Sequence, residues 1–426
     1  MTLVSIGKMR KEPIACFLIQ LFREKACLEV HRQKTLERAS KSLVLLAIQD
    51  TSYIDYSSHK SKTDMDVDNR IGTTEKTGII LHTTYLVGDN GVPIGILSQE
   101  YCSRPELVDR QGKSKAWHNL SLPIEQKESM RWIRNMEDCS NLSPRADSVI
   151  QICDREADII EFYLACQRKN QRFVIRAKDT RLLQIGKTKR AVQRLDQFLE
   201  EIPSTGEMVV NLKNGKNDED RQARMAIKYS SISLRPKIHR CKNSEYQVDE
   251  PIKLMVIEAC EIDPPKGEEK LHLVLFTSDL VNDFNDACIR ISWYSKRWTI
   301  EVFHKILKSG LKVESSRLGT RERVVKFLAL ASVLAFRIHW LTIASRKNPE
   351  SSCESEFSSD EWKPLAILNG NKINNETPPT IKEMTRWIAK LGGFMDRKGD
   401  GDSLRYNLME RAWKIVRIFA RLAASS

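Results

Sequence analysis

Apolar and polar positions follow two different spacings along the chain, and these predict helices at its ends and a sheet in its middle. Residues 17–36 place apolar and charged side chains at helical spacing, so one or two helices are expected there. Residues 43–48 form a continuous apolar run that polar residues bring to an end. A run of this length is typical of a strand that is buried on both faces of a sheet. Asp50 is then expected at the carboxyl end of this strand.

A hairpin and a second strand that ends in an acid follow. Residues 77–87 and 92–101 are rich in strand-forming side chains, and the turn Gly-Asp-Asn-Gly at residues 88–91 separates them. The Asn-Gly pair favours a hairpin because it readily supplies the positive φ of tight turns. The apolar residues 148–153 end in Asp154, before a helix and a further strand. The order strand, hairpin, strand, helix, strand predicts an α/β fold with a mixed sheet.

The second half of the chain returns to strands and then becomes helical. Polar loops and two β-rich runs predict an inserted β-rich subdomain, and residues 283–309 then show helical spacing, with Asp283 near the positively polarised amino end. Another helix is expected at residues 321–344. We therefore divide the chain into a short helical segment 1–40, the first part of an α/β core 41–184, the insertion 185–281, the second part of the core 282–345, and a linker with a helical region 346–426.

Charge and cysteine usage narrow the class of protein. Lys and Arg number 69 against 56 Asp and Glu, which gives a net charge of +13 and makes a polyanion the first partner to consider. The ten cysteines are scattered without a Cys-x-x-Cys or a zinc-type spacing, which favours a reduced, intracellular protein. The longest apolar stretch, residues 327–336, is far shorter than the ~20 residues of a membrane span. We expect neither a membrane segment nor a cleaved secretory signal.

Three acids are candidates for chemistry. Asp50 and Asp154 each follow an apolar strand, and Glu301 lies in the helix predicted at residues 283–309, among basic and aromatic residues. If the strands are neighbours and the helix packs on them, the three carboxylates converge. Hard oxygen ligands of this kind suit Mg²⁺ or Mn²⁺, and two such ions ~3.5–4 Å apart can activate an attacking oxygen and stabilise a leaving oxygen. The alternative is that the acids only cap the amino ends of helices.

One face of the predicted helix gathers four polar side chains. Tyr294, Arg297, Glu301 and Lys308 lie at offsets 0, 3, 7 and 14, which at about 100° per residue fall on one side of a helix. From such a face a carboxylate can reach metal ions while Arg and Lys hold phosphate oxygens. Ordinary charge pairing on a solvated helix face is the alternative.

Together these residues resemble the cut-and-paste transposases of bacterial insertion sequences, which carry an Asp-Asp-Glu triad and the signature Tyr-x2-Arg-x3-Glu-x6-Lys. The four residues of the helix face fit that signature without a gap. The likeness extends to Leu-Leu-Ala-Ile-Gln-Asp-Thr around Asp50, to Ile-Cys-Asp-Arg-Glu-Ala-Asp around Asp154, and to Leu-Gly-Gly-Phe at residues 391–394. It covers most of the chain from about residue 41 to the end.

The resemblance implies a ribonuclease H-like catalytic core of the retroviral-integrase superfamily, interrupted by the β-rich insertion, and a dimerising helical C-terminal region. It further implies that Asp50, Asp154 and Glu301 hold two Mg²⁺ ions, with Mn²⁺ as a substitute. Such an enzyme hydrolyses a strand at the transposon end, and the freed 3′ hydroxyl attacks the opposite strand to make a hairpin before insertion. The implied partners are double-stranded DNA, at terminal inverted repeats and at target sites, and a second copy of the chain, in the cytoplasm of a bacterium.

A basic run joins the residues that the resemblance assigns to DNA. By that resemblance, Tyr294, Arg297 and Lys308 hold the DNA end. Residues 163–194 also carry ten Lys or Arg against one acid, a balance that fits either a solvated face or a surface that tracks phosphates. The contacts expected from this run are Arg176 and Lys178.

Two apolar positions concern the stacking of a side chain on an unpaired or flipped DNA base. Trp298 can stack on an unpaired base, although a Trp beside the buried face of a helix more often belongs to the core. Leu273 stands where relatives carry a Trp that stacks on a flipped base. The resemblance therefore leaves the use of a hairpin intermediate undecided.

Two other functions stay open at this point. The first is a truncated, non-catalytic relative that binds DNA or dimerises and so inhibits transposition. It is considered because Asp50 lies nearer the start of the chain than the resemblance leads us to expect. The second is a stand-alone structure-specific nuclease, which would share the metal site but would not use a 3′ hydroxyl as nucleophile. Strand joining separates this nuclease from a transposase.

Overall fold

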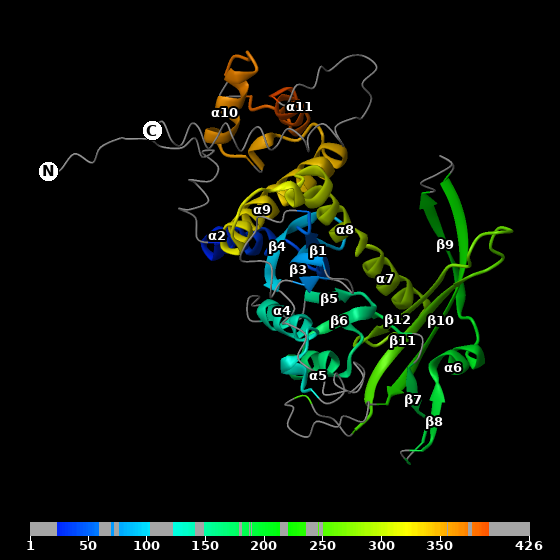
Figure 1. Cartoon of the computed structure of the whole chain (residues 1–426). Helices are drawn as coiled ribbons and strands as arrows, with labels where there is room; N and C mark the ends of the chain where they lie inside the picture. The colour runs from blue at the N-terminus through cyan, green and yellow to red at the C-terminus, as the bar shows by residue number, and fades with distance from the viewer. Residues whose placement is uncertain are drawn as a thin grey trace.

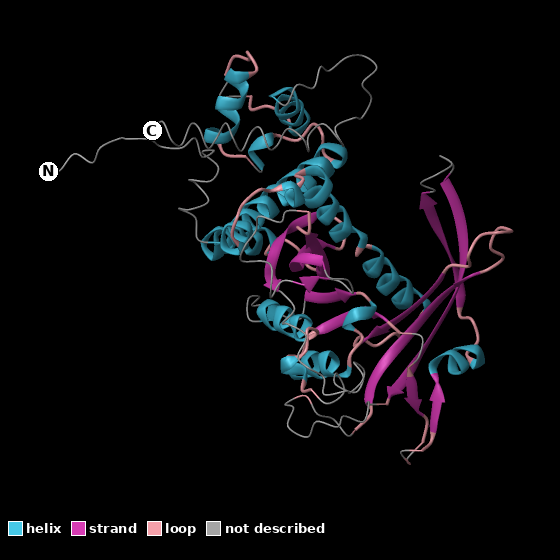
Figure 2. Ribbon diagram, in the orientation of Figure 1, coloured by secondary structure: helices cyan, strands magenta, loops and turns pink. Residues whose placement is uncertain are grey.

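The fold is built on one large mixed sheet with helices packed on both faces of its core (Figure 1). The computed structural model describes residues 24–58, 70–71, 76–102, 122–140, 149–178, 181–186, 188, 190–213, 220–235, 246, 250–355, 357–373 and 377–391. Within these residues a 12-stranded sheet has the order β2-β3-β1-β5-β6-β12-β11-β10-β7-β8, with β4 paired to β3 and β9 paired to β10. The predicted α/β class and the helical C-terminal region are confirmed (Figure 2).

The core of the sheet has the strand order β4-β3-β1-β5-β6. β1 runs parallel to β5 and β5 parallel to β6, whereas β3 is antiparallel to both β1 and β4. This arrangement is consistent with the expected ribonuclease H-like core. These strands and the short β2 span Leu45–Asp55 (β1), Arg70–Ile71 (β2), Lys76–Gly88 (β3), Pro93–Cys102 (β4), Val149–Cys153 (β5) and Arg172–Arg176 (β6).

β1 is longer than the apolar run that predicted it. The pattern predicted a strand that ends at Asp50, but β1 continues to Asp55, which lies opposite Gly78 of β3. That prediction was wrong because the antiparallel partner β3 supports the strand through its polar half. The pairing of β1 with β5, in contrast, ends at Ile48. Asp50 therefore lies inside β1, just past the point where β5 stops accompanying it.

The predicted hairpin is confirmed between β3 and β4. In its turn Gly91 has φ +79°, and its amide donates to the Gly88 carbonyl at 2.9 Å. Asn90 does not adopt the left-handed conformation, and its Oδ1 instead accepts the Val92 amide at 2.9 Å. Asn favours turns through such bonds to its own backbone neighbours. The Asn-Gly pair thus stabilises the turn by two separate means.

The β-rich insertion extends the same sheet outward from β6 (Figure 1). β12 pairs antiparallel with β6, with Leu275 opposite Arg176. The pattern predicted β11 and β12 but missed β10, in which the buried Ala223, Met225 and Ile227 alternate with the less buried Arg224 and Ala226. The elements of this region span Leu182–Gln184 (β7), Val192–Arg194 (β8), Leu195–Glu201 (α6), Gly206–Lys213 (β9), Asp220–Leu234 (β10), Ile252–Glu261 (β11) and His272–Thr277 (β12).

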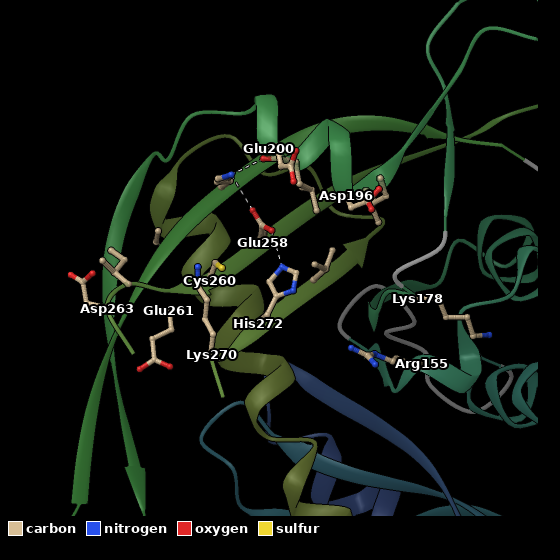
Figure 3. A pocket seen from close by; sticks show the side chains of 16 residues that line it. Arg155, Lys178, Asp196, Glu200, Glu258, Cys260, Glu261, Asp263, Lys270 and His272 are labelled. Carbon is tan, nitrogen blue, oxygen red and sulfur yellow. Dashed lines mark hydrogen bonds and ion pairs between the residues drawn. The ribbon is translucent and has the colours of Figure 1, made fainter. Parts of the chain in front are cut away.

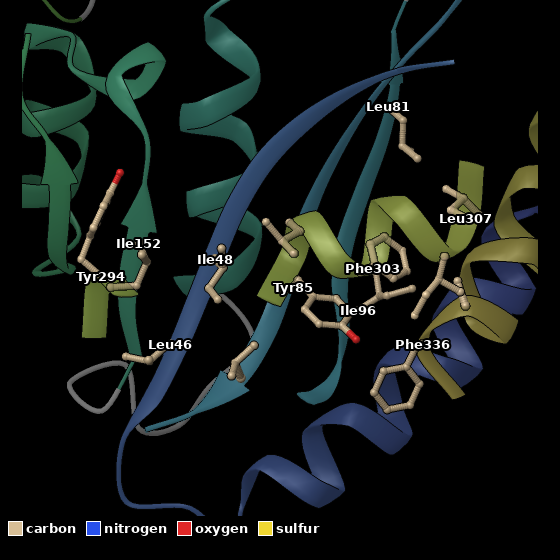
Figure 4. Packing of buried hydrophobic residues seen from close by; sticks show 14 of the residues in the cluster. Leu46, Ile48, Leu81, Tyr85, Ile96, Ile152, Tyr294, Phe303, Leu307 and Phe336 are labelled. Carbon is tan, nitrogen blue, oxygen red and sulfur yellow. The ribbon is translucent and has the colours of Figure 1, made fainter. Parts of the chain in front are cut away.

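Helices cover both faces of the core sheet. Trp132 of α4 and Phe162 of α5 pack in one apolar cluster, while Phe303 of α8 and Phe336 of α9 pack around Tyr85 in another (Figure 4). The helices span Glu24–Ala39 (α2), Met130–Ser140 (α4), Ile160–Arg168 (α5), Phe284–Ser295 (α7), Trp298–Lys305 (α8), Arg321–Lys347 (α9), Ser359–Leu368 (α10) and Ile381–Leu391 (α11). Short 3₁₀ turns span Ile124–Gln126 (η2), Arg155–Ala157 (η4), Val313–Ser315 (η6) and Cys353–Ser355 (η7).

The helix predicted over residues 283–309 is divided into three segments. A tight turn separates α7 from α8, and a π-helical turn, Ile306–Gly310 (η5), follows α8. At the first break the Arg297 amide donates to the Tyr294 carbonyl at 2.9 Å, a bond to the third residue back that tightens the helix. The single helix was therefore a wrong prediction. Its amino end is confirmed, because the Asp283 carboxylate accepts a first-turn amide at 2.7 Å.

The length and composition of α9 would allow it to cross a membrane. Its most apolar window is nevertheless 61% buried inside the protein, where Leu328 and Phe336 pack in the cluster beneath the sheet. A core helix of a globular domain shows the same combination of length and apolar composition. No other helix among the described residues meets these criteria. The Leu-Gly-Gly-Phe motif at residues 391–394 lies almost entirely outside the described residues.

A buried ion pair ties the loop after β5 to the chain after β6. Asp158 is fully buried, and its carboxylate accepts bonds from the Tyr163 hydroxyl at 2.6 Å and from the Lys178 amide at 2.7 Å. Arg181, which is 5% exposed, donates to the same carboxylate. Removing one partner of such a pair leaves a buried charge without compensation.

We expect Asp158→Asn to lower the free energy of unfolding by about 3–5 kcal/mol, because the Arg181 guanidinium loses its counter-charge. Asp196→Asn is the matched control, since Asp196 pairs with Arg194 and both side chains are about half exposed. Exposed pairs of this kind contribute little to stability. Urea denaturation followed by circular dichroism measures both variants. Equal effects of the two substitutions would contradict the structural role of Asp158.

Candidate active site

The pairing of two parallel strands brings Asp50 and Asp154 side by side. Ile48 of β1 lies opposite Ile152 of β5. Asp50 comes two residues after Ile48 within β1, and Asp154 comes two residues after Ile152, directly after the last residue of β5. Residues two apart in a strand point to the same face, so both carboxylates point to the face that α8 covers. Neighbouring strands lie about 4.7–4.9 Å apart. The juxtaposition expected from the sequence is therefore present for these two acids.

Arg297 connects the third acid to the first. It stands at the amino end of α8 and donates to the carboxylate of Glu301, four residues later. Its other terminal nitrogen lies 4.0 Å from Asp50 Oδ2. Burial opposes the charge of Arg297, but Tyr294, Glu301 and Asp50 outweigh burial and raise its pKa. A single guanidinium therefore lies between Glu301 and Asp50 and offsets part of their combined negative charge.

His304 also approaches the first acid. Its Nδ1 lies 3.6 Å from Asp50 Oδ2, and its Nε2 is buried without a hydrogen-bond partner among the described residues. The ring follows Glu301 by three residues, so both side chains lie on one face of α8. The structure makes it a neighbour of the acids.

The carboxylate of Asp154 carries an electrostatic cost in the folded protein. Burial raises its pKa to about 6, the Glu156 amide opposes this shift, and the charge of Asp50 adds to it. That amide donates to Asp154 Oδ1 at 2.8 Å and thereby caps the 3₁₀ turn η4. The capping role considered from the sequence is thus real for Asp154, and it coexists with the position beside Asp50.

Two of the three acids, Asp50 and Asp154, offer carboxylate oxygens that suit a divalent cation. Two adjacent carboxylates concentrate negative charge, which Mg²⁺ or Mn²⁺ would relieve. Glu301, however, is engaged by Arg297. Within the described part of the chain no three His, Cys, Asp or Glu side chains lie close enough together to hold a metal ion. Asp50 and Asp154 therefore fit a metal as a pair, and Glu301 would join them only after it leaves Arg297.

The remaining signature residues occupy two different places. The Tyr294 hydroxyl is buried at the turn before α8 and makes no hydrogen bond with the described residues. Burial raises the pKa of Tyr294, and the charge of Arg297 opposes the shift. Lys308 lies in η5, where its Nζ donates to the Tyr53 carbonyl at 2.9 Å and stands 3.3 Å from Glu314. The single helix face that the spacing predicted is thus interrupted, because Lys308 contacts the far end of β1.

The basic run at residues 163–194 does not form one uniform surface. Arg172 and Arg181 make ion pairs within the fold. Arg176 Nε is buried without a hydrogen-bond partner in the described chain, and Lys178 Nζ donates to a backbone carbonyl at 3.1 Å. Arg172 therefore joins the core to the insertion through Asp279, whereas Arg181 and Lys178 bond to Asp158 within the core. A DNA contact through Arg176 and Lys178 stays a prediction.

Trp298 lies on the surface and not in the core. Its side chain is 66% exposed at the first position of α8, next to Arg297. A solvated indole is available for stacking on a base, which a core Trp would not be. Leu273 lies in β12 opposite Ala259 and packs partly buried against the core cluster. Of the two apolar positions considered from the sequence, only Trp298 offers an aromatic surface.

A pocket opens between the insertion and the core (Figure 3). Arg155 and Lys178 line its core side, and Glu258 and His272 line it from β11 and β12. Glu258 accepts a hydrogen bond from His272 Nε2 at 2.8 Å. These two polar side chains of the pocket wall therefore bind each other. None of the three candidate acids lines the pocket. The candidate chemistry is therefore placed at the acids and not in this pocket.

Residues 333–423 match the family model of the transposase Tn5 dimerisation domain. The match indicates a transposase-type protein. It begins within α9 and includes α10 and α11, and residues 392–423 of the matched range lie outside the described residues. A transposase dimerisation domain also supports formation of a homodimer. The three acids lie outside the matched segment, so the match supports the type of protein and leaves their role to be proposed.

We expect Asp154→Asn to stabilise the metal-free protein at neutral pH. The folded pKa of Asp154, about 6, lies above the ordinary value of 3.8. The folded state then binds this proton more tightly than the unfolded state, and stability falls as pH rises from about 4 to 6. Without that carboxylate the protein should be more stable above pH 6 by on the order of 3 kcal/mol, and the difference should vanish near pH 4.

Thermal unfolding in excess chelator, compared between acidic and neutral buffers, measures this difference. Asp89→Asn is the control, because Asp89 lies exposed in the hairpin turn and its replacement should not change the pH dependence. Equal melting temperatures of wild type and Asp154→Asn at neutral pH would show that the charged Asp154 carboxylate does not lower the stability of the folded protein.

Proposed function

We propose that this chain is a DNA transposase that cleaves strands at transposon ends and joins a freed 3′ hydroxyl to target DNA, in the cytoplasm of a bacterium. The observation that carries the proposal is the strand register that sets Asp50 beside Asp154, with Arg297 between Asp50 and Glu301. The match to a transposase dimerisation domain supports the same function from a separate part of the chain. The net charge of +13 suits a polyanionic substrate.

In this proposal Asp50, Asp154 and Glu301 hold two Mg²⁺ ions, or Mn²⁺ in their place. When bound, the ions supply electrostatic stabilisation to the attacking and leaving oxygens of phosphodiester cleavage. The chain contributes the placement of the acids, because β1 and β5 fix two of them and α8 presents the third. Since Arg297 bonds to Glu301, release of Glu301 from this guanidinium precedes a site with three carboxylates.

Arg297 is the residue best placed to couple DNA to the acids. Guanidinium binds phosphate bidentately, so a backbone phosphate can replace carboxylates as its partner. A phosphate bound in this way would free Glu301. The buried Tyr294 hydroxyl adds an unused donor at the same turn, and the exposed Trp298 adds a surface for stacking. We assign Arg176, Lys178 and Lys308 to further contacts with the DNA backbone.

A homodimer on paired transposon ends is the proposed active assembly, because a dimer with two-fold symmetry can hold two ends equivalently. One observation favours a second candidate function. The matched segment is the dimerisation region. A non-catalytic relative that inhibits an active transposase by pairing with it would need this region and no catalytic site. A nuclease that shares the acids but joins no strands is distinguished by its products.

Substitution of the triad should separate catalysis from DNA binding. Asp50→Asn, Asp154→Asn and Glu301→Gln should each abolish Mg²⁺-dependent strand cleavage, because each removes a proposed metal ligand, while DNA affinity persists. Glu258→Gln is the control, since it removes the charge of a buried carboxylate that lines the pocket and not the acid site. Cleavage of labelled terminal-repeat DNA and a gel-shift titration measure the two properties.

Cleavage by wild type in excess chelator, or full activity of any triad variant, would contradict the two-metal proposal. A wild-type chain that binds DNA and dimerises but cleaves nothing would favour the inhibitor. Cleavage without strand joining would identify a nuclease.

Arg297→Ala should weaken DNA binding and reduce the slope of log affinity against log salt by about one unit, as expected for one lost phosphate contact. Lys34→Ala is the control, because it removes an equal charge from a 63% exposed side chain on α2. Fluorescence anisotropy with terminal-repeat DNA over a range of salt concentrations gives both slopes. An unchanged slope in Arg297→Ala would restrict Arg297 to its contacts with Glu301 and Asp50.

A further inference from the structure

Arg131 is a buried cation that bonds to the segment around Asp50 and to the segment around Asp154. It lies in the first turn of α4, and its side chain is 5% exposed. Its Nε donates to Thr51 Oγ1 at 3.1 Å, and a terminal nitrogen donates to Glu156 Oε2 at 2.8 Å. Thr51 follows Asp50 directly in β1, and Glu156 lies in the turn that follows Asp154. One guanidinium therefore spans the two acid-bearing segments.

The bond to Glu156 reaches Asp154 through a single amide. The Glu156 amide donates to Asp154 Oδ1 at 2.8 Å, and it belongs to the residue whose side chain Arg131 holds. A shift of Glu156 would move this donor and so turn the Asp154 carboxylate. Arg131 is thereby connected to Asp154 through Glu156 without touching it.

The bond to Thr51 continues into a buried chain of hydrogen bonds. Thr51 Oγ1 lies 2.9 Å from His82 Nδ1, and His82 Nε2 lies 3.0 Å from Gln49 Oε1. Gln49 Nε2 in turn donates to Gln151 Oε1 at 2.8 Å. The chain thus crosses from β3 through β1 to β5, and His82, Gln49 and Gln151 are fully buried.

The direction of this chain follows from the chemistry of its members. Burial, and next the charge of Arg131, lower the pKa of His82 well below its usual range, so the ring is neutral and has one donor nitrogen. Because the Gln49 amide group donates onward, its oxygen accepts from His82 Nε2, and His82 Nδ1 accepts from the Thr51 hydroxyl. Every donor then points away from Arg131. The chain ends at Gln151, whose buried Nε2 has no hydrogen-bond partner among the described residues.

We propose that Arg131 is a positioning residue that sets the separation and orientation of Asp50 and Asp154, and thereby the affinity of this pair for a divalent cation. The inference rests on the proposed metal-dependent function. Arg suits the task because its planar fork bonds to Thr51 and Glu156 at once, whereas the ammonium of Lys is a point charge on a flexible stem. Arg131→Lys keeps the charge but should not hold both segments.

The test is a Mn²⁺ titration of the full chain by isothermal calorimetry, at a temperature where each variant is folded. Arg131→Gln should weaken Mn²⁺ binding by about 10- to 100-fold, the range found when groups that orient metal ligands are removed. Arg134→Gln is the matched control, because Arg134 lies one turn later on α4 and pairs with Glu100, away from both acids. It should bind Mn²⁺ as the wild type does.

A double-mutant cycle separates positioning from general stability. Glu156→Gln should reproduce part of the loss in Mn²⁺ affinity, and its addition to Arg131→Gln should cost little more, because the shared contact is already gone. Merely structural substitutions would lower the melting temperature and leave the affinity of the folded protein unchanged. If Arg131→Gln does not fold, Arg131→Lys and Glu156→Gln carry the same comparison.

The outcomes distinguish this inference from the proposed function. Equal Mn²⁺ affinity in wild type and the Arg131 variants, or an equal loss in Arg134→Gln, overturns the positioning role alone. A wild type that binds no Mn²⁺, or binds it undiminished after Asp154→Asn, overturns the metal site and therefore both proposals.

Discussion

The site depends on one constraint, the parallel pairing of β1 with β5 in a single register. From Leu45 opposite Val149 to Ile48 opposite Ile152 the strands match residue for residue, which fixes where the acids beyond them stand. A slip of one residue would turn one acid to the other face of the sheet. The same register places Ile48 and Ile152 in the apolar cluster beneath α8. The packing of the core and the meeting of the carboxylates therefore have a single cause.

Two carboxylates at a partly buried edge repel each other, and different elements reduce that cost. Arg297 of α8 brings a cation to Asp50, and the turn after β5 brings an amide to Asp154. His304 approaches Asp50 from the same helix as Arg297. The compensation is incomplete, as the raised pKa of Asp154 shows. Residual negative charge of this kind attracts cations. The same repulsion that lowers the stability of the fold would therefore favour the binding of a metal ion.

The strands and their two acids could be predicted because continuous apolar runs are local signals. The length of β1 could not, since the residues beyond Asp50 are polar and remain in the strand through pairing with β3. The break between α7 and α8 leaves the helical spacing of residues 283–309 intact, so the pattern could not reveal it. Arg131 gave no signal, because its role comes from Thr51 and Glu156, which lie 80 and 25 residues away in the chain.

α9 links the site to the region of dimerisation. Its amino half packs through Val324 and Leu328 in the apolar cluster that also contains Phe303 of α8. Its carboxyl half lies in the segment similar to a transposase dimerisation domain, where Leu341 clusters with Ile381 of α11. One continuous helix thus supports α8 and belongs to the region that would contact a second copy. Packed side chains of this one helix therefore connect α8 to the segment similar to the dimerisation domain.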